Sequence, residues 1–180
     1  NILSESEFGI NPAGYTIHSA VHMGRKDAGC VMHTHTAAGL GVATQKSGLL
    51  PLTQMALAVI AQTGYHDYEG PAFDLRELDR LINDLASNNV LILRNHGLLT
   101  VGKTVAEAFV WLFRAERACR FQLSFQQAGA PAQEIPNKVQ DISIERSKKA
   151  ISASGHRPIG QFEWPALLRK LNRENPGYAE

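Results

Sequence analysis

The sequence has little of several features that would assign a protein class directly. Its 180 residues include only two cysteines, Cys30 and Cys119, which are too few for a disulfide framework. The 18 lysines and arginines nearly balance 17 acidic residues, and the net charge of +1 excludes an obvious basic surface for nucleic acid. No apolar run approaches the roughly 18 residues of a transmembrane helix, so we expect no membrane partner. Without a visible signal peptide, we expect a cytoplasmic protein.

Motifs of several enzyme classes are missing as well. We find no nucleophile elbow and no dinucleotide-binding fingerprint. The stretch 97–104, GLLTVGKT, does match the spacing of a phosphate-binding loop. However, Leu98 to Val101 is apolar and strand-like, whereas a phosphate cradle needs a loop with exposed backbone N–H groups. We therefore expect a strand that ends at Gly102 and a helix whose first turn is capped by Thr104.

Helical patterns are present at three places in the chain. Apolar residues recur at helical spacing from near Tyr15 onward. Two further helices are predicted by a capping side chain followed three residues later by a glutamate that reaches back to the backbone. These pairs are Asp74 with Glu77 and Thr104 with Glu107.

Strand-like runs alternate with these helices. They are short and apolar, and they lie at 29–33, 90–93 and 98–101. After Gly129 the character changes to a linker, a helix over 137–154 and a short helix around 164–168. Interleaved strands and helices predict a mixed α/β layer fold.

Two of the seven histidines suggest a metal site. His33 and His35 alternate at the end of the first strand-like run, so both imidazoles would project to one face, about 7 Å apart at the backbone. That arrangement suits two ligands of one metal ion. The alternative is that both are strand-end histidines hydrogen-bonded to the backbone.

His96 is the candidate for a third ligand. It lies at a break between two strand-like runs, next to Gly97, which permits a tight turn. Neutral imidazole suits zinc and related divalent ions, and three protein ligands leave positions open for water or substrate. An ion bound in this way can polarise a carbonyl group or stabilise an enolate. The alternative is that Asn95 to Gly97 forms a hairpin turn and nothing more.

Two other groups of residues compete for a functional role. His18 and His22 share one helix face at the spacing of helical zinc sites, but Ser19 stands where a metalloprotease has glutamate. The alternative is a helix surface with two packed or solvated histidines. The polar and aromatic cluster 65–69, YHDYE, could transfer protons. It could equally be an ordinary turn or a subunit contact.

Several separate motifs, in order, resemble those of the class II aldolase/adducin family in its adducin-like bacterial branch. They span the chain from about Asn11 to Gln127, and 163–169, EWPALLR, is similar to the tail of bacterial members. The motifs are 11–22 (NPAGYTIHSAVH), 31–36 (VMHTHT), 48–52 (GLLPL), 65–70 (YHDYEG) and 93–99 (LRNHGLL).

The resemblance implies a fold, an assembly and a metal. The fold would be a three-layer α/β/α sandwich with a largely antiparallel central sheet. The assembly would be a homo-oligomer, usually a tetramer, with metal sites near subunit boundaries. The family's ligand positions fall on His33, His35 and His96, and zinc is the expected ion.

One departure from the family affects the chemistry. The sugar-phosphate aldolases and epimerases of the family carry an acidic residue four positions before the equivalent of His18, and here that position is Gly14. The catalytic acid/base residue is therefore unknown. We expect a metal-dependent lyase that cleaves or decarboxylates a small hydroxy-carbonyl substrate through a metal-stabilised enediolate. The alternative is a non-catalytic adducin-like module that oligomerises and holds a structural metal.

The chain starts with Asn1 rather than Met, and the family's early phosphate-binding loops have no counterpart in it. We expect residues 1–129 to form the class II aldolase/adducin-like domain, with its N-terminal part lying outside the sequence. Residues 130–180 would be a linker and a helical tail that packs on this domain or on a neighbouring subunit.

Overall fold

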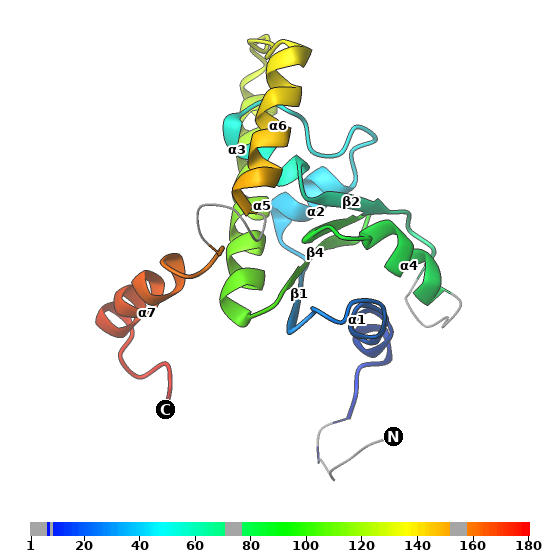
Figure 1. Ribbon diagram of the computed structural model, residues 1–180, viewed down its shortest axis with the longest axis vertical. Coiled ribbons are helices and arrows are strands. Elements are labelled where there is room, and N and C mark those ends of the chain that lie inside the picture. The colour runs from blue at the N-terminus through cyan, green and yellow to red at the C-terminus, as the bar shows by residue number, and fades with distance from the viewer. Residues whose placement is uncertain (1–6, 8, 71–76, 152–157) are drawn as a thin grey trace.

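The fold is organised around one four-stranded sheet (Figure 1). The computed structural model describes residues 7, 9–70, 77–151 and 158–180. The strands, in spatial order β1-β4-β3-β2, are β1 (Cys30–Thr34), β4 (Gly97–Gly102), β3 (Val90–Leu93) and β2 (Thr63–His66). β4 pairs antiparallel with both β1 and β3, and β2 pairs parallel with β3. The prediction of a largely antiparallel sheet is confirmed.

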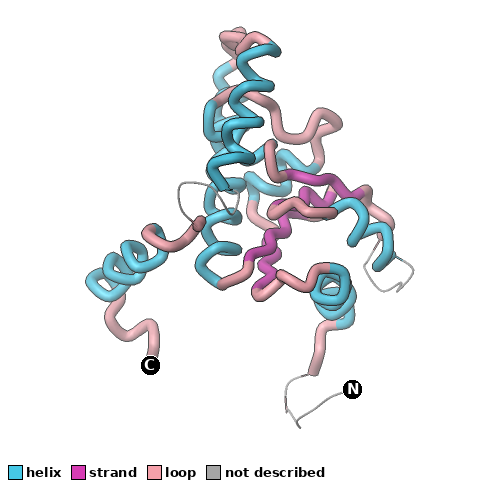
Figure 2. Tube along the Cα trace, in the orientation of Figure 1, coloured by secondary structure: helices cyan, strands magenta, loops and turns pink. Residues whose placement is uncertain are grey.

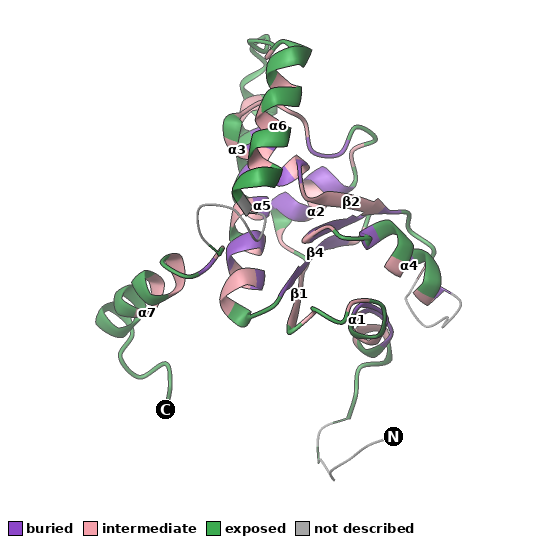
Figure 3. Cartoon of the chain, in the orientation of Figure 1, coloured by how far each residue is buried: buried purple, intermediate pink, exposed green. Residues whose placement is uncertain are grey.

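Helices cover both faces of the sheet, as Figure 2 shows with the strands between them. On one face, α1 (Pro12–Gly24) and α4 (Leu78–Leu85) enclose a buried cluster that includes Leu91 and Leu99. On the other face, α2 (Ala37–Ala43), α3 (Gln54–Ile60) and α5 (Val105–Ala128) enclose a cluster around Leu98 and Trp111. Figure 3 shows the burial concentrated in this middle region. The three-layer α/β/α sandwich is therefore confirmed.

The capping signature at Thr104 works largely as the sequence predicts. The backbone N–H of Glu107 donates to the Thr104 hydroxyl at 3.1 Å, and the Glu107 carboxylate accepts from the backbone N–H of Lys103 at 2.7 Å. The helix ends at Gly129, which adopts the left-handed conformation. The preceding GLLTVG segment is the fully buried strand β4. The strand and cap expected for 97–104 are thus both observed.

The capping signature at Asp74 has a different outcome. Asp74 lies outside the described residues, and α4 begins only at Leu78, with Glu77 in the N-cap position. The Glu77 carboxylate makes no capping hydrogen bond; it is buried and contacts His66 instead. Tertiary packing therefore turned a predicted capping residue toward the sheet.

The C-terminal helices are less enclosed. α6 (Asn137–Ile151) packs beside α3, and residues 152–154 of the predicted helix lie outside the described part of the chain. α7 (Glu163–Glu174) has no buried residue and touches α5 through an Arg114–Glu163 ion pair and a Trp164–Phe109 ring contact. Among the described helices, none is long and apolar enough to cross a membrane. The division of the chain at residue 129 stays a prediction.

Candidate metal centre

Strand register places the important histidines on one face of the sheet. His33 is paired with Leu99 across β1 and β4, and His66 is paired with Leu93 across β2 and β3. Paired residues of neighbouring strands point to the same face. Leu93 and Leu99 belong to the cluster enclosed by α1 and α4, so His33 and His66 also face those helices.

Three imidazoles converge at the strand ends on this face. One ring nitrogen from each of His33, His35 and His96 lies within 4.8 Å of the others. The ring centroids are 4.6–4.8 Å apart, and the Nε2 atoms of His33 and His35 are separated by 2.8 Å. In the described part of the chain this is the one group with metal-ligand geometry. The sequence expectation that these three side chains share one space agrees with this geometry.

The turn that carries His96 was one of the alternatives left open by the sequence. Residues 94–96 do form the hairpin turn between β3 and β4, and that turn is what brings His96 to the end of β1. Asn95 and Gly97 both have positive φ, at 57° and 153°. A Cβ atom at Gly97 would lie 2.4 Å from the Thr34 carbonyl oxygen and 3.2 Å from the His35 ring. Glycine is therefore required for this close approach.

The hydrogen bonding of His33 orients its free nitrogen. Nδ1 donates to the Leu98 carbonyl at 2.9 Å, so in the neutral ring the lone pair of Nε2 faces the other two imidazoles. Burial lowers the pKa of His33 to about 4, although the Leu98 carbonyl acts in the opposite direction. Burial also lowers the pKa of His96. Both residues are thus held in the neutral form that binds metal ions.

These shifts predict that acid destabilises the metal-free protein. His33 takes a proton near 6.5 when unfolded but only near 4 when folded, so the unfolded chain binds more protons between these values. The free energy of unfolding should therefore fall as the pH falls from about 6.5 to about 4, by roughly 1–3 kcal/mol. Urea unfolding with a chelator present measures this. His33→Gln should remove part of the dependence, and an unchanged dependence in that variant would contradict the assignment.

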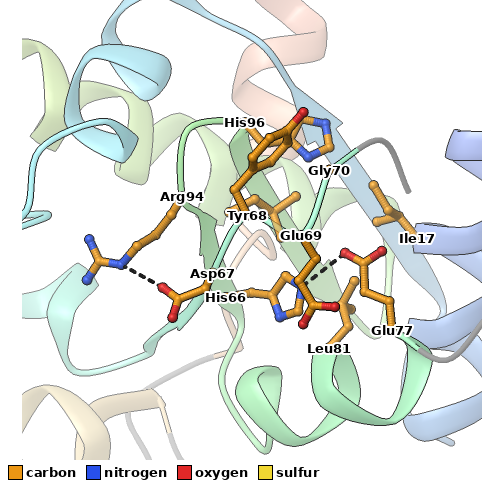
Figure 4. A pocket seen from close by; sticks show the side chains of 11 residues that line it. Ile17, His66, Asp67, Tyr68, Glu69, Gly70, Glu77, Leu81, Arg94 and His96 are labelled. Atoms are coloured by element: carbon orange, nitrogen blue, oxygen red, sulfur yellow. Dashed lines mark hydrogen bonds and ion pairs between the residues drawn. The ribbon is translucent and has the colours of Figure 1, made fainter. Parts of the chain in front are cut away.

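A small pocket opens beside His96 (Figure 4). It lies between the ends of β2 and β3 and the helices α1 and α4, and Ile17 and Leu81 form apolar parts of its wall. Its polar lining consists of His66, Asp67, Tyr68, Glu69, Glu77, Arg94 and His96. The site thus combines a nitrogen-ligand cluster with a neighbouring group of carboxylates.

Most of the 65–69 cluster has structural contacts. The Tyr65 hydroxyl accepts from the Leu49 backbone N–H at 3.1 Å, and its ring lies under the Arg94 guanidinium. Asp67 lies 3.4 Å from Arg94, and Glu69 forms an ion pair with Arg80. Tyr68 differs, since its exposed ring lies edge-on to His96 with centroids 6.5 Å apart.

The competing pair on α1 does not form a ligand group in the described residues. His22 is exposed and its Nδ1 lies 3.1 Å from the Ala28 carbonyl. His18 is partly buried, and burial lowers its pKa. Gly14 lies in the first turn of the same helix, and a Cβ atom there would be 3.9 Å from the Asn11 side chain.

The structure adds two residues that the sequence reasoning did not connect with the site. The His66 ring lies between two carboxylates, with Nδ1 2.7 Å from Asp84 and Nε2 3.0 Å from Glu77. Asp84 and Glu77 are seven positions apart, which is about two helical turns and one face of α4. That spacing in the sequence already indicates that the two carboxylates share one helix face. The packing of β2 against this face is seen only in the tertiary structure.

Comparison with known proteins decides the family. The sequence profile described as Class II Aldolase and Adducin N-terminal domain matches residues 1–123. The chain belongs to this family. A Pseudomonas aeruginosa protein with a class 2 aldolase name is 48% identical over 184 residues, which cover 99% of this chain and 68% of the relative. Rat alpha-adducin is 39% identical over 181 residues, covering 96% of this chain and 24% of the adducin.

A solved structure has the same fold as this class II aldolase/adducin domain. The aldolase II superfamily protein from Pseudomonas syringae superposes with a TM-score of 0.83 and 43% sequence identity. The match covers 94% of this chain and 66% of that protein. The chain therefore spans about two thirds of its bacterial relatives and about a quarter of the adducin.

Proposed function

We propose that this domain is a metal-dependent lyase of the class II aldolase type, with a divalent ion, zinc, held by His33, His35 and His96. The proposal rests on one observation, the convergence of three imidazole nitrogens within 4.8 Å. The ligand nitrogens of a tetrahedral zinc site are about 3.3 Å apart, given bonds of about 2.0–2.1 Å. The three rings need only small adjustments to reach that spacing.

The substrate we propose is a small hydroxy-carbonyl compound. A bound divalent ion polarises such a group and stabilises the enediolate that forms when a C–C bond breaks by aldol cleavage or decarboxylation. The protein's own residues orient the ligands: the Leu98 carbonyl holds the His33 ring, and Gly97 lets the turn carry His96 into place. We further propose that the protein acts in the cytoplasm as a homo-oligomer, a tetramer, with residues 130–180 packing on the domain or on a neighbouring subunit.

The similarity to adducin supports a second candidate, a non-catalytic binding module. Alpha-adducin is 39% identical to this chain, although the match covers only 24% of its length. In such a module the metal would be structural, and its removal would lower stability without ending any turnover. Turnover of a hydroxy-carbonyl compound that depends on metal would decide for the lyase.

Metal titration tests the proposal directly. We expect about one zinc ion per chain by equilibrium dialysis and elemental analysis, and removal by a chelator. At a zinc concentration of about 100 times Kd, binding adds about 2.7 kcal/mol of stability, which raises Tm by about 5–10 °C. A protein that binds no divalent ion even after loading would rule out both the lyase and the structural-metal module.

A further inference from the structure

A hydrogen-bonded row of three ionisable side chains, two of them buried, lies beside the metal centre. Asp84, His66 and Glu77 are joined through the two nitrogens of the His66 ring, at 2.7 and 3.0 Å. His66 is 3% exposed and Glu77 is 6% exposed, whereas the Asp84 side chain is 41% exposed. The three side chains therefore lead from solvent, at Asp84, into the protein interior, at Glu77.

The inner end of this row of side chains, Glu77, reaches the pocket described above. Glu77 and His66 both line the cavity that His96 borders, and Figure 4 shows the Glu77 carboxylate paired with the His66 ring inside it. Burial lowers the pKa of His96, and the charge of Glu77 acts in the opposite direction. The charge of Glu77 thus acts on His96, the imidazole that borders the same pocket.

The hydrogen bonding allows a proton to move along the chain. When both His66 nitrogens carry protons, both carboxylates are ionised and accept from the ring. When the proton on Nε2 passes to Glu77, His66 becomes neutral and still donates from Nδ1 to Asp84. The total charge of the three groups is −1 in both arrangements, so the transfer changes no net charge in the interior, where such a change is costly.

In the described part of the chain, the ligand cluster itself contains no carboxylate. Gly14, in α1, has no side chain that could transfer a proton. A reaction through an enediolate needs a group that removes a proton from carbon and returns it. Asp67 and Glu69 are exposed and paired with Arg94 and Arg80, whereas Glu77 is buried and paired with a titratable ring.

We propose that Glu77 is the proton-transferring carboxylate of this site, and that His66 and Asp84 are positioning residues that connect it to water. This inference rests on the proposed function. In the step assigned to Glu77, a C–H bond next to the substrate carbonyl breaks. The proton goes to the Glu77 carboxylate, and the electron pair moves to the carbonyl oxygen to form the enediolate. The reverse step returns the proton to carbon, and His66 and Asp84 exchange it with solvent.

The test uses the zinc-loaded full chain and dihydroxyacetone as the probe. In D2O, NMR follows the replacement of the probe's C–H protons by deuterium. We expect exchange with the unaltered protein and a loss of at least about 100-fold with Glu77→Gln, in line with the usual contribution of a general acid/base. The Glu77→Gln protein should still bind one zinc ion. Asp79→Asn, an exposed acid on the same helix, is the matched control and should exchange at the unaltered rate.

Two further variants separate proton transfer from a structural role. Glu77→Asp keeps a carboxylate and should recover part of the exchange lost in Glu77→Gln. Asp84→Asn should lower the rate and alter its pH profile while KM for the probe stays unchanged. Without metal, ¹⁵N NMR should show altered His66 resonances in Glu77→Gln and Asp84→Asn, and unaltered resonances for His33 and His35.

The possible results distinguish the two proposals. Equal exchange in the unaltered protein and in Glu77→Gln overturns the role of Glu77 and leaves the lyase proposal in place. Altered resonances of His33 and His35 in Glu77→Gln also overturn it, since the variant would then act through the metal centre. Zinc binding by the unaltered protein without exchange of the probe overturns the lyase proposal, and the role of Glu77 with it.

Discussion

Replacing His33 with alanine is expected to lower zinc affinity by more than about 100-fold and to end any metal-dependent turnover. Loss of an outer-shell partner alone lowers metal affinity by about 10- to 100-fold, and His33 is a proposed ligand itself. Its ring is also the best anchored of the three, because Nδ1 donates to the Leu98 carbonyl at 2.9 Å. Competition with a chromogenic chelator measures the affinity, and circular dichroism checks that the variant is folded.

His22→Ala is the matched control for this substitution. His22 is exposed on α1, and its Nδ1 contacts only the Ala28 carbonyl among the described hydrogen bonds. Zinc affinity in this variant should stay within about twofold of the unaltered protein, since surface changes away from a site have small effects. Equal losses in His33→Ala and His22→Ala would mean that zinc binds at scattered surface histidines, and the proposed centre would be wrong.

Gly97→Ala should destabilise the fold and weaken zinc binding together. The added Cβ would lie 2.4 Å from the Thr34 carbonyl oxygen, at a residue whose φ is 153°. Backbone strain and overpacking each cost about 1–3 kcal/mol, so we expect a loss of about 2–4 kcal/mol in the free energy of unfolding. Because the clash separates the turn from the end of β1, His96 should move away from His33 and His35.

Urea unfolding and zinc competition, both on the same preparations, test this prediction. Gly14→Ala is the control, because Gly14 lies in α1 and the added Cβ would be at an ordinary contact distance, 3.9 Å, from the Asn11 side chain. In a helix this change should be neutral or stabilising by up to about 1 kcal/mol. A Gly97→Ala protein with unaltered stability and zinc affinity would show that the turn does not position His96.

Local sequence signals predicted several elements of this fold well. Thr104 and Gly129 mark the limits of α5 because a capping hydroxyl and a left-handed glycine act through bonds to neighbouring backbone groups. The apolar run 90–93 became the buried strand β3 of the same length, and the run 98–101 became the middle of the buried strand β4. His33 lies in β1, whereas His35 lies one residue beyond the end of that strand, so strand alternation alone does not explain why the two rings meet.

Other features of the site could not be read from local patterns. Glu77 has the sequence position of a capping residue, and its carboxylate turns to His66 because α4 packs against the end of β2. Asp84 lies 18 residues beyond His66, and nothing in the intervening sequence specifies that distance in space. Contacts of this kind depend on which helix face the sheet covers.

The sequence alone is enough to assign the family and the first turn of α5, because these depend on motifs and on bonds between neighbouring residues. It names His33, His35 and His96 as candidate ligands through the family resemblance. The tertiary structure is needed to see that the hairpin turn at Asn95 carries His96 to the end of β1. It also decided that Asp84, His66 and Glu77 form one hydrogen-bonded chain beside the pocket. The physical reason is that strand pairing and helix packing bring together side chains whose separation along the chain carries no signal of their contact.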